Sequence, residues 1–131
     1  MNEQCRAKFY EVLNNNQKHP IIVEGLEPHD IGGAVVIPAT ISLFDLGSLS
    51  NDKPLWVAQL ERTPASRKFL VINRIDTLKD DDQEKFAWLL QNRQDNGYKL
   101  GNDVQILLAV GKGSADKINQ KIKSLCINWR L

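Results

Sequence analysis

The sequence has few of the residues that build metal centres or disulfide frameworks. Its 131 residues include two cysteines, Cys5 and Cys126, and two histidines, His19 and His29. Neither cysteine belongs to a Cys-x-x-Cys pair, which is the usual spacing of zinc ligands. We therefore expect no metal site, and we expect both cysteines to be idle thiols in a reducing compartment.

Long apolar runs and an excess of one charge are also missing. No apolar segment approaches the ~20 residues that a membrane-spanning helix requires, and the polar residues 1–4 lack the apolar region of a signal peptide. The 17 basic and 16 acidic side chains leave a net charge of +1, so no overall field attracts nucleic acid or an anionic membrane. A cytoplasmic protein without membrane contact is expected, while nucleic-acid binding through a local basic patch stays open.

Short apolar runs alternate with segments of helical spacing along the chain. Strands are predicted over residues 20–23, 34–37 with a continuation at 40–44, 68–73, 104–110 and 127–131. Helices are predicted over 3–16, 54–62, 80–96 and from Ser114 onward, with a polar loop at 45–53. Strands that are apolar throughout and alternate with helices favour a parallel sheet covered on both faces. The pattern predicts one α/β domain, residues 1–131, with a three-layer, doubly wound and mainly parallel five-stranded sheet.

One segment carries a specific resemblance. Residues 69–78, FLVINRIDTL, resemble the Walker B strand of AAA+ ATPases, in which four apolar residues precede an Asp-Glu pair. The helix predicted at 80–96 then corresponds to the helix that follows Walker B, and residues 97–110 resemble the loop and the sensor 1 strand. Residues 121–126, KIKSLC, resemble the segment of clamp-loader subunits that carries their arginine finger. The resemblance covers residues 66–131 well and 18–45 by strand order, and it implies a P-loop NTPase, AAA+-like fold with strand order 5-1-4-3-2.

The resemblance places unsuitable residues at the positions that bind and hydrolyse ATP. The family's Asp-Glu pair holds Mg²⁺ and polarises the attacking water, but Asn73 and Arg74 stand there in this sequence. A phosphate-binding loop, GxxxxGK[ST], should follow the first strand. Residues 24–33, EGLEPHDIGG, lack that motif, and their carboxylates would repel phosphate.

Two further elements depart from the family. Leu125 occupies the arginine-finger position, and the sensor 1 strand ends in Val110-Gly111-Lys112 in place of a polar Asn or Thr. The sequence stops at Leu131, after the last predicted strand, whereas a full AAA+ module continues into a helical lid. We therefore expect no lid domain, no catalytic residue, no bound cofactor and no enzymatic activity.

A retained frame without catalytic residues predicts a protein-interaction or assembly module. The resemblance implies a protein partner, for example an active AAA+ subunit. Two alternatives stay open: a divergent nucleotide-dependent ATPase, and a DNA-replication or mobile-element associated protein of clamp-loader type.

The partner contacts are expected where the carboxyl ends of the strands meet, because ligands of doubly wound sheets favour that crevice. The loops at 25–33, 74–79 and 111–114 converge there, and their charged side chains are the candidate contact residues: Glu27, Asp30, Arg74, Lys79 and Lys112. Arg74 ranks first, since a planar guanidinium pairs bidentately with acceptors on a partner. The alternative reading of Arg74 is a structural salt bridge to Asp76.

Overall fold

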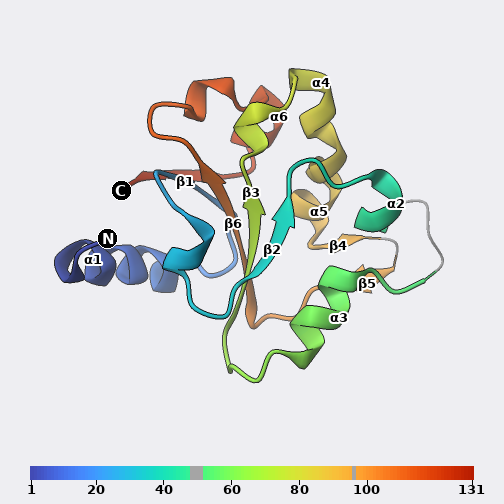
Figure 1. Ribbon diagram of the computed structural model, residues 1–131, viewed down its shortest axis with the longest axis horizontal. Helices are drawn as coiled ribbons and strands as arrows, with labels where there is room; N and C mark the ends of the chain where they lie inside the picture. The colour runs from blue at the N-terminus through green and yellow to red at the C-terminus, as the bar shows by residue number, and fades with distance from the viewer. Residues whose placement is uncertain (48–51, 96) are drawn as a thin grey trace.

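The centre of the molecule is a five-stranded sheet. The computed structural model describes residues 1–47, 52–95 and 97–131. The strands lie in the order β2-β3-β6-β1-β7 (Figure 1), and every pairing between neighbours is parallel. Their bounds are β1 (Ile21–Glu24), β2 (Val35–Pro38), β3 (Lys68–Asn73), β6 (Val104–Val110) and β7 (Ile127–Arg130). Counted along the chain without the strands of a separate hairpin, the order reads 5-1-4-3-2.

The central strands of the sheet are apolar because both of their faces are buried. All seven residues of β6 are buried, because β6 has strands on both sides and other elements on both faces. Its residues pair in register with β3 on one side, Leu70 with Ile106, and with β1 on the other, Ile22 with Leu108. Continuous apolar character is typical of strands in parallel sheets that are buried on both faces. The mainly parallel α/β sheet predicted from the sequence is confirmed.

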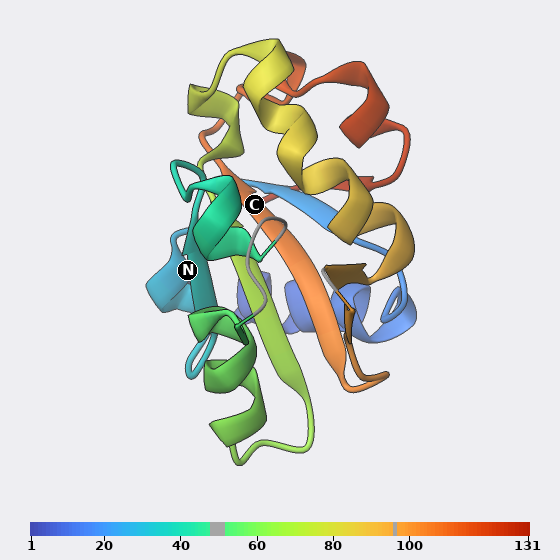
Figure 2. The same cartoon turned by 90° about the vertical axis from the view of Figure 1, so that its right-hand side faces the viewer.

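The helices form two outer layers (Figure 2). Helix α1 (Glu3–Asn15) packs Phe9 and Leu13 against one face of the sheet. The other face carries α3 (Leu55–Arg62), α5 (Ala87–Asn92) and α6 (Gln120–Lys123), which bury Trp56, Leu89 and Ile122 among others. The remaining α-helices of the described ranges, α2 (Leu43–Leu46) and α4 (Asp80–Gln83), are short. Among the helices of the described ranges, none has the length and apolar character needed to cross a membrane.

The helix predicted over 80–96 is shorter and broken. It consists of α4, a 3₁₀ turn at Glu84–Phe86 and α5, which ends at Asn92. Arg93 adopts a left-handed conformation with φ 54°, so the chain turns and forms a small antiparallel hairpin, β4 (Gln94–Asp95) with β5 (Tyr98–Lys99). The predicted end of the helix at Asn96 lies outside the described residues.

Two other local predictions are wrong. The last helix does not begin at Ser114; a 3₁₀ turn at Ala115–Lys117 comes first, and α6 starts after Asn119, whose side chain accepts a hydrogen bond from the Lys121 N–H. The second strand does not continue through 40–44, because the Ser42 hydroxyl caps α2 by accepting a hydrogen bond from the Asp45 N–H. The polar loop predicted at 45–53 lies partly outside the described residues.

Candidate interaction site at the carboxyl edge of the sheet

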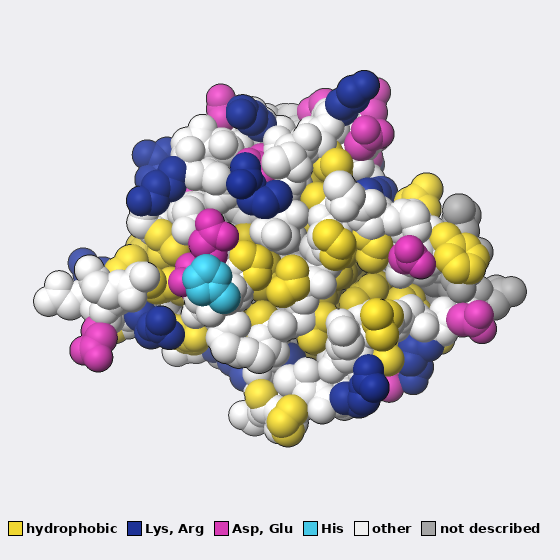
Figure 3. Space-filling model, viewed as in Figure 1, with side chains coloured by type: hydrophobic (Ala, Val, Ile, Leu, Met, Phe, Trp, Pro, Cys, Tyr) yellow, Lys and Arg dark blue, Asp and Glu magenta, His cyan; other side chains and the backbone are white. Residues whose placement is uncertain are grey.

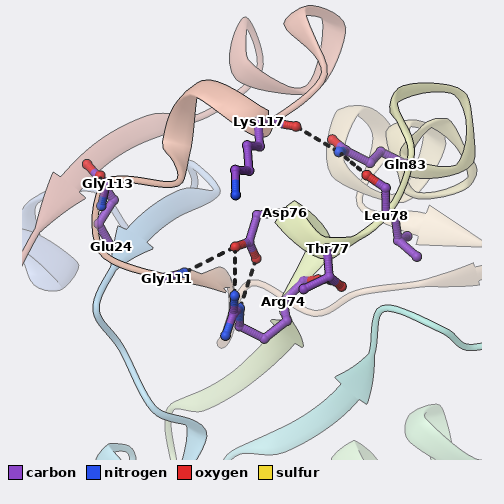
Figure 4. A network of polar contacts seen from close by, with 9 residues as sticks. All are labelled: Glu24, Arg74, Asp76, Thr77, Leu78, Gln83, Gly111, Gly113 and Lys117. Atoms are coloured by element: carbon purple, nitrogen blue, oxygen red, sulfur yellow. Dashed lines mark hydrogen bonds and ion pairs between the residues drawn. The ribbon is translucent and has the colours of Figure 1, made fainter.

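The carboxyl ends of β1, β3 and β6 meet at one edge of the sheet, where the chain places several charged side chains (Figure 4). Glu24 is the last residue of β1, Arg74 directly follows β3, and Gly111 directly follows β6. Parallel strands bring these positions together although they are far apart in the sequence. In doubly wound sheets, this edge is the place where ligands bind.

The connection that leaves β1 contains no α-helix. Residues 25–34 are all described, and their only regular element is a 3₁₀ turn at Pro28–Asp30. The Glu27 N–H donates to the Asp30 carboxylate at 3.0 Å, so this side chain stabilises the turn itself. A phosphate cradle of the P-loop type needs the N-terminus of a helix here, with backbone N–H groups that point at the anion. The β1–β2 connection cannot supply that arrangement.

Glu24 is a buried carboxylate with a full set of partners. Its side chain is 3% exposed and accepts hydrogen bonds from Asn128 Nδ2 at 3.0 Å, Arg130 Nη2 at 3.1 Å and the Gly113 N–H at 3.1 Å. The hydrogen bonds from Asn128 and then Arg130 lower the pKa of Glu24 below its usual value, against the opposing effect of burial. Glu24 therefore carries a fixed negative charge at the end of β1.

Arg74 and Asp76 form a second charged pair. Asp76 Oδ1 and Oδ2 accept from Arg74 Nε and Nη2, both at 3.0 Å, and Oδ2 also accepts from the Gly111 N–H at 3.4 Å. Arg74 has φ 65°, a left-handed conformation that few residues other than glycine adopt. A Cβ at Gly111 would lie 3.2 Å from Arg74 Nη2, so glycine leaves room for the guanidinium. The structural salt bridge considered from the sequence is present.

The carboxylates of Glu24 and Asp76 both bind the turn that follows β6. The turn after β6, residues 111–114, follows a strand and could offer its N–H groups to an anion. Two of those groups are engaged: the Gly111 N–H by Asp76 and the Gly113 N–H by Glu24. The protein's own carboxylates thus occupy donors that an external phosphate would need.

The five predicted contact residues fall into separate places. The side chain of Arg74 is 48% exposed. Its hydrogen bonds to Asp76 are the main cause that raises the pKa of Arg74, followed by the charge of Asp76 and, to a lesser extent, that of Glu27. Asp30 and Lys112 line one hollow of about 240 Å³, and the Lys112 side chain lies against Gly25. The structure therefore brings Arg74 near Glu27, and Asp30 near Lys112.

Lys79 does not join either group. It is exposed at the N-cap of α4, after the turn Ile75–Thr77. Within the described ranges, no hydrogen bond or ion pair links its side chain to the other four candidates. Its position offers a charge to a partner but no preorganised site.

The sequence analysis missed a buried polar cluster beside this edge. Gln83 Nε2 donates to the carbonyls of Leu78, at 3.1 Å, and Lys117, at 2.9 Å (Figure 4). Gln83 Oε1 accepts from the Asn119 N–H at 2.7 Å. The bonds to Lys117 and Asn119 fasten the last residue of α4 to the segment between β6 and α6. Gln83 is fully buried, and only its place among apolar helix positions could have indicated this.

Asn128 and Arg130, which hold Glu24, were also not singled out. They alternate with Ile127 and Trp129 in the last strand, and that alternation of polar and apolar residues is the signal that could have identified them. Their side chains lie on the same side of the sheet as Glu24.

Metal-binding and thiol chemistry find little support in the described ranges. No group of three or more His, Cys, Asp or Glu residues there is arranged to hold a metal ion. Both cysteines are free thiols, and burial raises the pKa of Cys126 to about 12. A thiol with that pKa is protonated at neutral pH and is a poor nucleophile.

A solved structure has a similar fold. The crystal structure of a DNA polymerase III gamma subunit-related protein from Thermotoga maritima matches the chain with a TM-score of 0.58 at 11% identity, over 95% of this chain and 45% of that one. The chain thus spans less than half the length of that protein. Such a likeness concerns the fold alone, and it supports the AAA+-like fold implied by the resemblance of residues 66–131. No protein-family model and no curated protein matches the sequence.

Proposed function

We propose that this chain is a non-catalytic AAA+-like domain, which acts as a protein-interaction or assembly module and does not hydrolyse ATP. The observation that carries the proposal is the occupation of the Gly111 and Gly113 N–H groups by the carboxylates of Asp76 and Glu24. A triphosphate at this edge would have to displace these two carboxylates to reach those donors.

The residues after β3 favour the same conclusion. Phosphoryl transfer depends on positioning and on electrostatic stabilisation by a metal and polar groups. Asn73 has no charge with which to hold Mg²⁺, and Arg74 places a cation where a water-activating carboxylate is required. The bidentate bridge to Asp76 also engages the carboxylate nearest to these positions.

The contact surface we propose centres on Arg74. Its Nε and Nη2 atoms bind Asp76, so within the described part of the chain Nη1 is the atom left to meet an acceptor on a partner. Glu27, Asp30, Lys79 and Lys112 add charges of both signs around it. A mixed rim of this kind suits a protein with complementary charges, such as an active AAA+ subunit, and gives specificity more than affinity.

A thermal melt with MgATP tests the loss of nucleotide binding. A ligand that binds the native state must raise the melting temperature by mass action. We expect no shift at millimolar MgATP, with Mg²⁺ alone and ATP with a chelator as controls. A saturable shift that requires both Mg²⁺ and ATP would favour the alternative of a divergent nucleotide-dependent ATPase.

Affinity capture from the native host tests the interaction role. Arg74→Lys keeps a cation beside Asp76 but removes the planar fork, so we expect less captured partner with a melting temperature close to that of the unmodified chain. The captured protein, identified by mass spectrometry, should contain an active AAA+ module. Equal capture by both forms would assign Arg74 to a structural role alone.

A second candidate is a DNA-replication associated protein of clamp-loader type. Two observations favour it: the fold match to the gamma subunit-related protein and the KIKSLC segment. In that case the captured partners should be clamp-loader subunits, and nuclease treatment of the lysate should not release them. Release by nuclease would point to contact through nucleic acid.

A further inference from the structure

The two edges of the central sheet differ in what they offer to another strand. An edge strand presents unpaired N–H and C=O groups, and proteins usually blunt such edges. The edges here are β2 and β7. Within the described part of the chain, no segment pairs with the outer side of either strand.

The β2 edge is blunted by proline. Ala39 donates its N–H to Asn73 on β3, and since successive residues of a strand point to opposite sides, Val36 and Pro38 face outward. Pro38 has no N–H, and its carbonyl already accepts from the Ile41 N–H at 3.0 Å. Apolar side chains are exposed across this side of the molecule (Figure 3), yet the backbone of β2 can pair only at Val36.

The β7 edge has no such protection. Ile127 and Leu131 both donate their N–H groups at 3.0 Å to carbonyls of the β1 segment, so residues 127, 129 and 131 face β1. The intervening residues, Asn128 and Arg130, direct their N–H and C=O groups to the open side. Neither is proline, and no bulge interrupts the register between β1 and β7. Two consecutive outward positions are therefore ready to pair.

We propose that β7 is a dimerisation strand, which pairs antiparallel with β7 of a second copy of this chain about a two-fold axis at Trp129. In an antiparallel pair, hydrogen-bonded and non-hydrogen-bonded positions alternate. The two-fold sets Asn128 opposite Arg130 of the second copy as a hydrogen-bonded pair, and the reciprocal pair follows by symmetry. Every outward group at these two positions then has a partner.

The side chains of β7 are self-complementary in this arrangement. On the α1 side of the sheet, Trp129 faces its own symmetry mate, and Ile127 faces Leu131 of the second copy, so apolar residues that are half-buried in one copy meet each other. On the other side, the cation of Arg130 faces the uncharged Asn128. Arg130 is also neutralised by Glu24 at 3.1 Å, so the pairing brings no like charges directly together.

The surface beside β7 has room for this contact. A hollow of about 400 Å³ lies between the first turns of α1 and β7, lined by Asn2, Gln4, Cys5, Lys8, Trp129 and Arg130. The aromatic pair at Trp129 would fill part of it. This matching of charge, apolar contact and backbone register is why a second copy fits the edge better than an unrelated strand.

The inference is independent of the proposed loss of ATP hydrolysis, because it rests on β7 and not on the carboxyl edge of the sheet. Sedimentation velocity of the full chain tests it directly. An interface of one short strand pair is small, so we expect a reversible dimer with a dissociation constant of about 100 micromolar. A chain that stays monomeric across a concentration series bracketing this value would overturn the proposal.

A matched pair of variants isolates the backbone contact. Asn128→Ala removes the side chain that binds Glu24 but keeps the N–H, whereas Asn128→Pro also removes the outward N–H without affecting the bonds to β1. We expect Asn128→Ala to dimerise and Asn128→Pro to remain monomeric. Equal dimerisation of the two variants would show that the contact lies elsewhere.

Hydrogen exchange on the unmodified chain decides the question if Asn128→Pro does not fold. The amides of Asn128 and Arg130 should become several-fold more protected as the protein concentration rises through the dissociation constant. The amides of Ile127, Trp129 and Leu131 bond within the copy, so their protection should change less. Concentration-independent exchange at Asn128 and Arg130 would contradict the proposal.

Discussion

Two connections reach the carboxyl edge of the sheet from neighbouring parts of the fold, and they are built differently. The β1–β2 connection, residues 25–34, holds one 3₁₀ turn and buries Leu26 and Ile31. The β3–β6 connection, residues 74–103, holds α4, α5 and the hairpin, and it buries Phe86, Leu89 and Leu90. In AAA+ ATPases the first connection carries the phosphate-binding loop, and the second begins at the carboxylate that polarises the attacking water.

The β1–β2 connection buries apolar side chains without forming an α-helix. The sheet face next to α1 is covered by Phe9 and Leu13 from that helix and by Leu26 and Ile31 from the β1–β2 connection. A helix after β1 is therefore not needed to bury this face. The β1–β2 connection covers this face together with α1, although its only regular element is a 3₁₀ turn.

The largest expected effect is a loss of stability caused by a substitution in the β3–β6 connection. Phe86→Ala removes a ring that is fully buried between the helices and the sheet, so the free energy of unfolding should fall by about 3–4 kcal/mol. Trp88→Ala is the control, since Trp88 lies two residues away and is 59% exposed. Urea titration should find its change within about 0.5 kcal/mol; similar losses in both variants would contradict the buried position of Phe86.

The next effect concerns the charged pair after β3. Asp76→Ala leaves the Gly111 N–H and two donor atoms of Arg74 without their acceptor. Loss of a buried, charge-assisted network of this size should lower the free energy of unfolding by about 2 kcal/mol. Asp81→Ala removes an exposed carboxylate from the first turn of α4 and should cost less than about 1 kcal/mol. Equal losses of stability in the two variants would mean that the hydrogen bonds of Asp76 contribute no more than the exposed charge of Asp81.

Much of the sheet could be predicted from the sequence, because strands that are buried on both faces are apolar almost throughout. Residues 69–72 and 104–110 are apolar almost throughout, and they became the central strands β3 and β6. The helix at 3–16 was equally visible from its spacing and differs from α1 by one residue at its end. Periodicity reports how a segment contacts the core, and these segments contact it strongly.

The rest depended on contacts that periodicity does not report. The break at Arg93 and the hairpin after it follow from a left-handed residue whose guanidinium donates to the carbonyls of Gly101 and Val104. The two side chains that bind Glu24, those of Asn128 and Arg130, lie more than a hundred residues away in β7. Glu24 was seen as a charge that repels phosphate, but its binding of Asn128 and Arg130 required the strand order and the register.

A smaller expected effect concerns Glu24, the last residue of β1, and the dependence of stability on pH. The folded pKa of Glu24 lies below its usual value, so the stability that it contributes is fully present above the unfolded glutamate pKa of about 4.3. That contribution is lost as the pH falls through the lower folded pKa. Unfolding experiments below pH 5 should therefore show a steeper acid loss for the unmodified chain than for Glu24→Gln.

Asn128→Ala serves as the matched variant for this experiment. It removes the hydrogen bond that contributes most to the lowered pKa of Glu24. The folded pKa then lies closer to the unfolded value, so the acid loss should be smaller and should be complete at a higher pH than in the unmodified chain. An unchanged profile in both variants would mean that other carboxylates dominate the acid unfolding.

The last experiment compares the two connections directly, and here we expect no change in nucleotide binding. Asn73→Asp with Arg74→Glu restores the acidic pair after β3 but leaves the β1–β2 connection without a phosphate cradle. We expect no shift of the melting temperature with MgATP and no phosphate release, because a metal-binding carboxylate cannot replace the missing N–H donors. Since Arg74→Glu sets a carboxylate beside buried Asp76 and weakens the fold, Asn73→Asp alone is measured in parallel, with circular dichroism to verify folding. A saturable MgATP shift in either variant would mean that the β3–β6 connection suffices for nucleotide binding. The contrast between the two connections would then no longer support the proposed loss of ATP hydrolysis.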